Sequence, residues 1–229
     1  MNILFDLDGT LTDPREGILR CYRHAMERLG LPTPADADLE RFIGPPLQDG
    51  FRTMLGPDSA DRLVEALQLF RERFSDRGLY ENAVYPGIVS ILTMLQARGI
   101  QFFIATSKPH VFATRIADHF GLTPWFRGVY GSELDGTRSA KADLLRHIME
   151  VEDLDPAVTI MVGDREHDIH GARANGLRSI GILWGYGSRQ ELESAGADAI
   201  CETPADLPRI LESSWSVLAM ARQAAHPQG

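Results

Sequence analysis

The feature that most constrains the fold is a regular alternation of two patterns after residue 87. Apolar runs of strand length alternate with segments whose apolar residues recur every three or four positions. We expect strands over 102–105, 128–130, 159–162 and 179–183, and helices over 89–96, 111–119, 140–149 and 169–175. This alternation predicts βαβ units, and therefore an α/β fold with a mainly parallel sheet and helices on both faces.

Another apolar run, Ile3-Leu4-Phe5, begins an expected strand over residues 3–8 that lies far from these strands in the sequence. It must join the same sheet, because a lone strand cannot satisfy its backbone hydrogen bonds. The residues between show only helical periodicity: Gly30 and Gly56 fall where helices should end, and Gly44-Pro45-Pro46 interrupts the stretch. We expect a discontinuous core over residues 1–14 and 83–212 closed by a helix over 205–212, an all-helical insertion over 15–82 and a tail over 213–229.

The composition excludes several classes of protein. The chain of 229 residues carries a net charge of -9, which provides no basic field to attract nucleic acid. No apolar stretch approaches the roughly 20 residues that a membrane span requires. Cys21 and Cys201 lie far apart and do not form a CxxC motif, so a Cys-based zinc site is not expected. We expect a cytoplasmic monomer or homodimer with no nucleic-acid or membrane partner.

Acidic residues follow two of the predicted strands. Asp6 and Asp8 end the first strand, and Asp164 and Asp168 follow the strand over 159–162. The carboxyl ends of parallel strands meet at one edge, where such folds bind ligands. Two carboxylates about 4 Å apart repel by about 4 kcal/mol at an effective dielectric near 20, so this cluster requires cations. Oxygen ligands favour Mg²⁺ together with a substrate phosphate, and Lys141 supplies a fixed positive charge.

This set of residues suits phosphoryl transfer. Asp6 would attack phosphorus to form an aspartyl-phosphate, while Asp8 protonates the leaving alkoxide and then activates water. Thr106, Ser107 and the first amides of the following helix supply donors to phosphate. The remaining expected substrate contacts come from the loop after Asp8, from Lys108 and from the break in the helical segment, namely Gly9, Thr10, Lys108, Gly44 and Pro45.

Four segments together resemble the motifs of the haloacid dehalogenase superfamily. They are DLDGTLTD at 6–13, ATSKP at 105–109, Lys141, and GDREHD at 163–168, in the order of that superfamily and spanning almost the whole chain. The resemblance implies a Rossmann-like core with an inserted helical cap that closes over substrate. It also implies Mg²⁺ held by Asp6, the Asp8 carbonyl and Asp164, with Asp168 orienting Lys141 or a metal-bound water.

The resemblance extends to one branch, the phosphoglycolate phosphatases and bacterial 5′-nucleotidase-like proteins. It is carried there by IGPPL at 43–47, TSKP, GDREHDIHGA and WGYGS at 184–188. The dehalogenases of the superfamily lack the proton donor at Asp8, so dehalogenation is not expected. The predicted enzyme is a Mg²⁺-dependent phosphatase acting on a small phosphorylated metabolite.

Several alternatives compete with these interpretations. A DxDGT segment can belong to a calcium loop, but no Glu follows at the twelfth loop position. His167 and His170 are spaced like a zinc pair without an evident third ligand, which favours a surface or supporting role. The aromatic loop over 184–187 can contact substrate or simply pack on the sheet, and its glycines do not form the GxGxxG pattern of dinucleotide-binding loops.

Two other functions use the same residues. A phosphomutase would return the phosphoryl group from Asp6 to a second hydroxyl of the substrate. A non-enzymatic phosphoacceptor module, like a signalling receiver domain, also combines acidic residues, a Thr or Ser and a Lys at a parallel-sheet edge. The predicted helical insertion argues against the receiver, which has no need of a lid.

Overall fold

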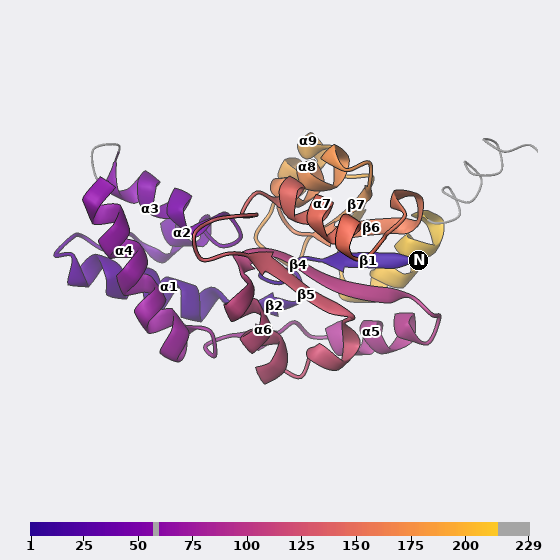
Figure 1. Cartoon of the computed structure of the whole chain (residues 1–229), viewed down its shortest axis with the longest axis horizontal. Helices are drawn as coiled ribbons and strands as arrows, with labels where there is room; N and C mark the ends of the chain where they lie inside the picture. The colour runs from indigo at the N-terminus through magenta and orange to yellow at the C-terminus, as the bar shows by residue number, and fades with distance from the viewer. Residues whose placement is uncertain (57–59, 215–229) are drawn as a thin grey trace, which may run out of the picture.

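The computed structural model describes residues 1–56 and 60–214, and its centre is a six-stranded parallel sheet (Figure 1). The strand order is β5-β4-β1-β6-β7-β8. In sequence order the strands are β1 (Asn2–Phe5), β4 (Gln101–Pro109), β5 (Gly128–Ser132), β6 (Thr159–Gly163), β7 (Arg178–Ile182) and β8 (Ala199–Cys201). β1 pairs in parallel with both β4 and β6, so the first strand of the chain lies in the middle. The α/β prediction is confirmed.

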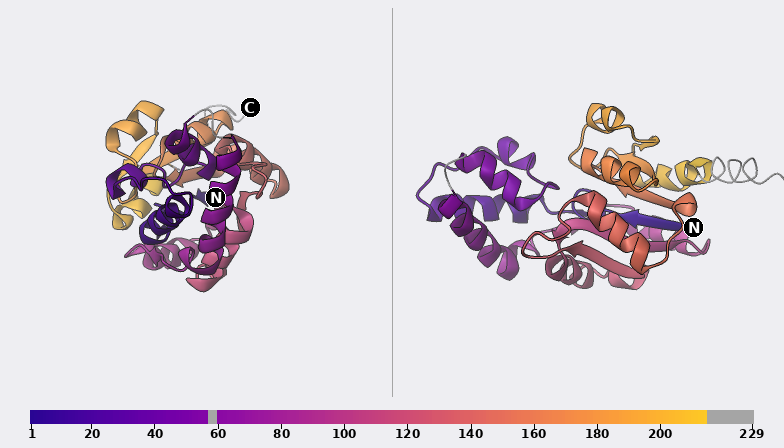
Figure 2. Two further views of the ribbon diagram at one scale, coloured as in Figure 1. Left: turned by 90° about the vertical axis from the view of Figure 1, so that its left-hand side faces the viewer. Right: turned by 45° about the horizontal axis from the view of Figure 1, so that its top comes forward.

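Helices cover both faces of this sheet (Figures 1 and 2). α5 (Ile88–Gln96) and α6 (His110–His119) lie on one face, and α7 (Lys141–Val151) and α8 (Glu166–Ala174) on the other. Side chains alternate along a strand, so Ile3 and Phe5 pack with the first pair of helices while Leu4 packs with the second. The apolar run Ile3-Leu4-Phe5 in β1 follows from this burial on both faces.

The segment between Asp13 and Ala83 folds into helices beyond the carboxyl ends of the strands (Figures 1 and 2). We call residues 15–82 the helical insertion. It contains α1 (Arg15–Arg28), α2 (Asp36–Glu40), α3 (Leu47–Leu55), α4 (Ala60–Arg73) and a π-helical turn, η1 (Phe74–Gly78). The chain enters and leaves the insertion through two short antiparallel strands, β2 (Thr12–Asp13) and β3 (Ala83–Val84).

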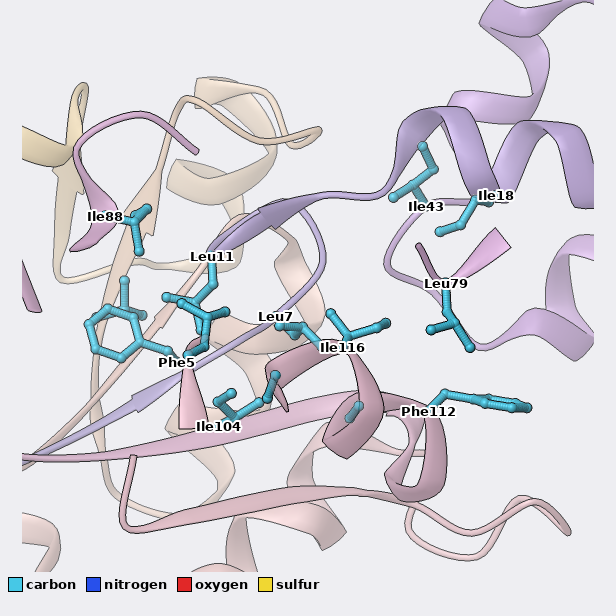
Figure 3. Packing of buried hydrophobic residues seen from close by; sticks show 14 of the residues in the cluster. Phe5, Leu7, Leu11, Ile18, Ile43, Leu79, Ile88, Ile104, Phe112 and Ile116 are labelled. Carbon is cyan, nitrogen blue, oxygen red and sulfur yellow. The ribbon is translucent and has the colours of Figure 1, made fainter. Parts of the chain in front are cut away.

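One hydrophobic core runs from the sheet into the helical insertion (Figure 3). Phe5 and Ile104 belong to the sheet, Leu7 and Leu11 to the loop after β1, and Ile18 to α1. Inside the insertion, the fully buried ring of Tyr22 lies 5.0 Å from the rings of both Phe51 and Phe70. This shared core places the insertion directly above the acidic strand ends.

The structure departs from the sequence-based elements mainly at their ends. β4 continues to Pro109 through an irregular register after Ala105, and α8 begins at Glu166, three residues before the predicted start. A two-turn helix, α9 (Arg189–Ala195), was not predicted, because so short a segment shows little periodicity. The closing helix begins at residue 207 after a 3-10 turn, η4 (Pro204–Asp206), and runs to the end of the described residues; the predicted tail beyond 214 lies outside them.

The remaining short elements are two further 3-10 turns, η2 (Thr123–Trp125) and η3 (Pro156–Val158). Gly30 and Gly56 follow α1 and α3 with positive φ, as expected of helix-ending glycines. Both cysteines are buried and unpaired. Among the described residues, no helix combines the length and the apolar character needed to cross a bilayer.

We expect Glu81 to stabilise the helical insertion by joining its two ends. Its carboxylate accepts hydrogen bonds from Arg20 on α1 (2.7 Å) and from both terminal nitrogens of Arg73 on α4 (2.8 and 3.0 Å). Glu81→Gln should lower the free energy of unfolding by about 1 kcal/mol at pH 7. Urea titration measures this loss, and Glu65→Gln, on the exposed part of α4, is the control.

The same network predicts a pH dependence. Hydrogen bonds from Arg73 lower the pKa of Glu81 below its usual value of 4.5. A lowered pKa stabilises the fold above the unfolded-state pKa, and the stability is lost as the pH falls through the folded-state pKa. The difference between Glu81→Gln and the unaltered chain should therefore shrink below about pH 4. A constant difference down to pH 3 would assign the effect to packing.

Candidate active site

The strand registers bring the predicted motifs to one edge of the sheet. Phe5 pairs with Ile104 of β4 and with Val162 of β6, so the residues that follow them emerge side by side. Asp6 follows directly on β1, and its backbone N–H donates to the Val162 carbonyl (2.9 Å). Asp164 follows directly on β6. Carboxylates 158 residues apart in the sequence therefore share one site.

Lys141 lies at the centre of the acidic cluster and is buried. Its Nζ donates to Asp6 Oδ1 (2.9 Å) and to the Ala105 carbonyl (2.8 Å), and it is 2.7 Å from Asp168 Oδ1. Burial by itself would lower the pKa of Lys141, but Asp168 and Asp6 raise it above the usual value, so the amine stays charged. The structure thus places Asp168 beside Lys141, as the resemblance implied.

The two carboxylates that flank Lys141 respond differently to burial. Burial raises the pKa of Asp6 to about 7, although Lys141 acts in the opposite direction. Burial also acts to raise the pKa of Asp168, but there the attraction of Lys141 prevails and the pKa lies below its usual value. The backbone N–H of Arg165 donates to Asp168 Oδ2 (3.1 Å), so both oxygens of Asp168 have partners. Asp168 is suited to hold Lys141 in place.

Asp8 faces a second ammonium group. Its Oδ2 is 2.8 Å from Lys108 Nζ, and the same Nζ lies 4.3 Å from the ring centroid of Phe74 in the helical insertion. Asp8 Oδ1 is buried with no hydrogen-bond partner within residues 1–56 and 60–214. This oxygen is therefore open to a substrate or a water molecule, as a proton-transferring group requires.

Asp164 is enclosed by two loops. Thr10 Oγ1 donates to its Oδ1 (3.3 Å), and the backbone N–H of Tyr186 donates to its Oδ2 (2.8 Å). Gly9 packs so closely that a Cβ there would lie 2.3 Å from Asp164 Oδ2. Burial, with Asp168 and Asp6 nearby, raises the pKa of Asp164 well above its usual value. Gly9 and Thr10, expected to contact substrate, are placed against Asp164.

The charge balance of the cluster fits a divalent cation. Two ammonium groups face four buried carboxylates, which leaves two negative charges without a counter charge within the set Asp6, Asp8, Asp164, Asp168, Lys108 and Lys141. Burial, and after it the neighbouring carboxylates Asp168 and Asp6, raise the pKa of Asp164, and a bound cation would favour its ionised form. The side chains of Asp6 and Asp164 and the backbone carbonyl of Asp8 offer only oxygen atoms as ligands, which suits Mg²⁺ better than a transition metal.

A second set of three residues, two aspartates and a histidine, also lies close enough together to hold an ion. Ligand atoms of Asp6, His167 and Asp168 all lie within 4.8 Å of one another. Lys141 Nζ, however, already occupies the position between the two carboxylates, at 2.9 and 2.7 Å. A cation bound there would displace the ammonium group, so the Asp6 and Asp164 side of the cluster fits a metal better.

His167 is a residue that sequence reasoning did not place in the site. Burial lowers its pKa to about 4, so the ring is neutral at pH 7. Its Nε2 is buried without a hydrogen-bond partner in the described part of the chain, whereas His170 is exposed. The two histidines do not form the zinc pair that their spacing resembles. Only the position of His167 within GDREHD could have indicated its place.

A pocket connects this site to the helical insertion. Asp8, Ser107 and Lys108 line it from the sheet, together with Gly44 and Pro45 from the insertion. Aromatic side chains form much of the remaining wall, namely Tyr22, Phe42, Phe70, Phe74 and Phe112. Thr106 is buried, and its Oγ1 accepts from the Lys108 backbone N–H (3.2 Å). The structure thus brings Gly44 and Pro45 to the same pocket as Asp8.

Two arginines that the sequence did not single out fasten the insertion to the core. Arg165 Nη1 donates to the Ile43 carbonyl (2.8 Å), next to Gly44. Arg71 of α4 donates through Nη2 to the Leu134 carbonyl after β5 (2.8 Å). The Arg71 side chain also lines the pocket, where its Nε is buried without a partner among the described residues.

Comparisons with known proteins agree with this geometry. A 5′-nucleotidase of Pseudomonas aeruginosa is 50% identical over 93% of this chain and 96% of that protein. The tyrosine-protein kinase PtkA of Mycobacterium tuberculosis is 36% identical over 86% of this chain and 67% of that protein. A phosphoglycolate phosphatase of Caulobacter vibrioides is 28% identical over 90% of this chain and 89% of that protein.

A solved structure and a family model give the same result. The crystal structure of a predicted phosphatase from Clostridium acetobutylicum superposes with a TM-score of 0.88 at 40% identity, covering 92% of this chain and 98% of the other. The model of the haloacid dehalogenase-like hydrolases matches residues 3–182, which include the four motifs at 6–13, 105–109, 141 and 163–168. This chain therefore belongs to the haloacid dehalogenase-like hydrolase family.

Proposed function

We propose that this hydrolase is a Mg²⁺-dependent phosphatase that acts on nucleoside 5′-monophosphates. The observation that carries the proposal is the pocket that joins the free oxygen of Asp8 to a wall of aromatic side chains from the helical insertion. Such a wall suits the flat aromatic faces of a nucleoside base, whereas phosphoglycolate offers only a single carboxylate besides its phosphate. The 50% identity to a 5′-nucleotidase supports the same substrate class.

The reaction begins at Asp6. Its carboxylate attacks phosphorus, the bond to the ester oxygen breaks, and the phosphoryl group becomes attached to Asp6. Asp8 donates a proton to the departing alkoxide and then accepts one from the water that hydrolyses the aspartyl-phosphate. Lys141 stabilises negative charge on Asp6 and on the phosphoryl oxygens, and Asp168 holds Lys141 in position.

Mg²⁺ would be held by Asp6, the Asp8 carbonyl and Asp164, where it would offset charge on the transferring phosphoryl group. Thr106 and Ser107 are buried near the end of β4, next to Lys108, and a phosphate oxygen can accept hydrogen bonds there. Lys108 can move its charge from Asp8 to a phosphate, which would leave the Asp8 carboxyl free for proton transfer. The expected roles of Thr106, Ser107 and Lys108 thus remain part of the proposal.

The first prediction concerns the nucleophile. Asp6→Asn should reduce phosphate release from AMP and from p-nitrophenyl phosphate by at least about 10³-fold, because an amide cannot form the phosphoenzyme. EDTA should abolish the same activity, and Mg²⁺ should restore it. Asp76→Asn, at an exposed position of the insertion, is the matched control. Phosphate release that survives both treatments contradicts the mechanism, and isomerised product without free phosphate would favour a mutase.

Proton donation by Asp8 predicts a dependence on the leaving group. Asp8→Asn should slow hydrolysis of AMP about 10²- to 10⁴-fold, because the nucleoside alkoxide that leaves from AMP must be protonated as it departs. Hydrolysis of p-nitrophenyl phosphate should be slowed much less, since its leaving group is already a stable anion. The first turnover, measured by rapid quench, isolates this step. Equal losses on both esters would show that Asp8 does not act as the general acid.

Substrate choice should depend on Arg71. Arg71 lines the pocket from the insertion and Lys108 lines it from the sheet, so a ligand must extend across the pocket to contact both. Arg71→Gln should raise KM for AMP about tenfold and leave KM for phosphoglycolate within about twofold. Arg62→Gln, at an exposed position of the same helix, is the control. A larger effect on phosphoglycolate would reverse the proposed preference and assign Arg71 to a substrate carboxylate.

A further inference from the structure

The loop after β7, residues 183–188, contacts both Asp164, the proposed metal ligand, and the base of the helical insertion. On its inner side, the Tyr186 backbone N–H donates to Asp164 Oδ2 (2.8 Å). The neighbouring Trp184 donates through Nε1 to the Thr10 carbonyl (2.9 Å), and Thr10 donates to the other oxygen of Asp164 (3.3 Å). Trp184 and Tyr186, on either side of Gly185, therefore help to fix the orientation of Asp164.

Glycines make this contact unusually close. A Cβ at Gly185 would lie 2.4 Å from the Gly9 carbonyl oxygen and 2.5 Å from Asp164 Cβ. A Cβ at Gly187 would lie 1.8 Å from the Asp164 carbonyl oxygen. The backbone of the loop therefore rests directly on Asp164, with no side chain between them that could absorb a movement. A displacement of the loop must displace Asp164.

On its outer side, the loop is tied to the base of the insertion through the side chain of Tyr186. The Tyr186 hydroxyl donates to Asp13 Oδ1, and the hydroxyl of Tyr85 lies beside it. Asp13 belongs to β2, and its Oδ1 accepts from the backbone N–H of Arg15, the first residue of α1. Tyr85 directly follows β3. The hydroxyl thus lies next to both chain segments, at β2 and after β3, that connect the sheet to the insertion.

We propose that Tyr186 is a positioning residue that couples the placement of the helical insertion to the geometry of the metal site. When the insertion lies as it does here, Asp13 and Tyr85 hold the Tyr186 side chain, and the Tyr186 amide holds Asp164. Coupling of this kind is reciprocal, so metal binding at Asp164 also stabilises the paired segments of β2 and β3. The inference rests on the proposed role of Asp164 as a Mg²⁺ ligand.

The test removes one atom. Tyr186→Phe keeps the ring and the backbone N–H to Asp164 but loses the hydroxyl that bonds to Asp13. Loss of a group that orients a metal ligand typically costs 10- to 100-fold in metal affinity, so we expect the Kd for Mg²⁺ from calorimetry to rise about tenfold. The KM for AMP at saturating Mg²⁺ should change less than twofold, because the pocket is untouched.

Tyr130→Phe is the matched control. The Tyr130 hydroxyl also donates to a carboxylate, Glu152, at a half-buried position on β5. Its loss should cost similar stability without changing the Kd for Mg²⁺. Asp13→Asn, which weakens the same hydrogen bond from the other side, should reproduce the Tyr186→Phe effect, and the double variant should be no worse than either. If Tyr186→Phe folds poorly, Asp13→Asn alone still tests the proposal.

Amide hydrogen exchange provides a readout that a purely structural role would not change. In the unaltered chain, Mg²⁺ should slow exchange at residues 12–13 and 83–85, and in Tyr186→Phe this slowing should be lost. An unchanged Kd together with unchanged Mg²⁺-dependent protection overturns this inference alone. If the unaltered chain fails to bind Mg²⁺, the proposed function fails and the coupling fails with it.

Discussion

The buried ammonium group of Lys141 is the interaction on which the rest of the site depends. An unpaired charge in a protein interior costs several kcal/mol, so Lys141 can be buried only where other groups supply partners. Those partners come from three separate elements: Asp6 from the end of β1, the Ala105 carbonyl from β4, and Asp168 from α8. Each strand and helix must therefore reach its position before the charge is satisfied, and the site is formed only in the complete fold.

Close packing makes this arrangement possible. A Cβ at Gly171 would lie 2.7 Å from Lys141 Cγ, and a Cβ at Gly163 would lie 2.3 Å from Asp168 Cγ. Glycine at these two positions lets α8 approach α7 and β6 closely enough for the ion pair to form. The sequence contains 21 glycines and does not distinguish these two from the rest, because the contact that requires them exists only in three dimensions.

The parts of the site that could be predicted follow from a local rule. Asp6, Thr106 and Asp164 each end a strand whose apolar run is visible in the sequence, and parallel strands end at a common edge. His167, Arg71 and Tyr186 follow no such rule: they come from a first helical turn, an inserted helix and a loop. Their roles depend on contacts with Asp6, Leu134 and Asp13 across 63 to 173 residues. Periodicity carries no information about such pairings. The helix α9 was missed for a different reason, because a segment so short shows little periodicity.

Chemistry and selection of substrate are assigned to different parts of the chain. The carboxylates and Lys141 belong to the α/β core, at the ends of its strands and in the first turns of α7 and α8, while most of the aromatic wall belongs to the helical insertion. The insertion can therefore change its lining without disturbing the buried charges, provided that its position remains fixed. That position depends on the shared hydrophobic core and on polar contacts at its edges, from Arg165 to the Ile43 carbonyl and from Tyr186 to Asp13. The same two residues also bind the acidic cluster, because the backbone N–H of Arg165 donates to Asp168 and that of Tyr186 donates to Asp164. The position of the insertion and the geometry of the acidic cluster therefore depend on the same residues.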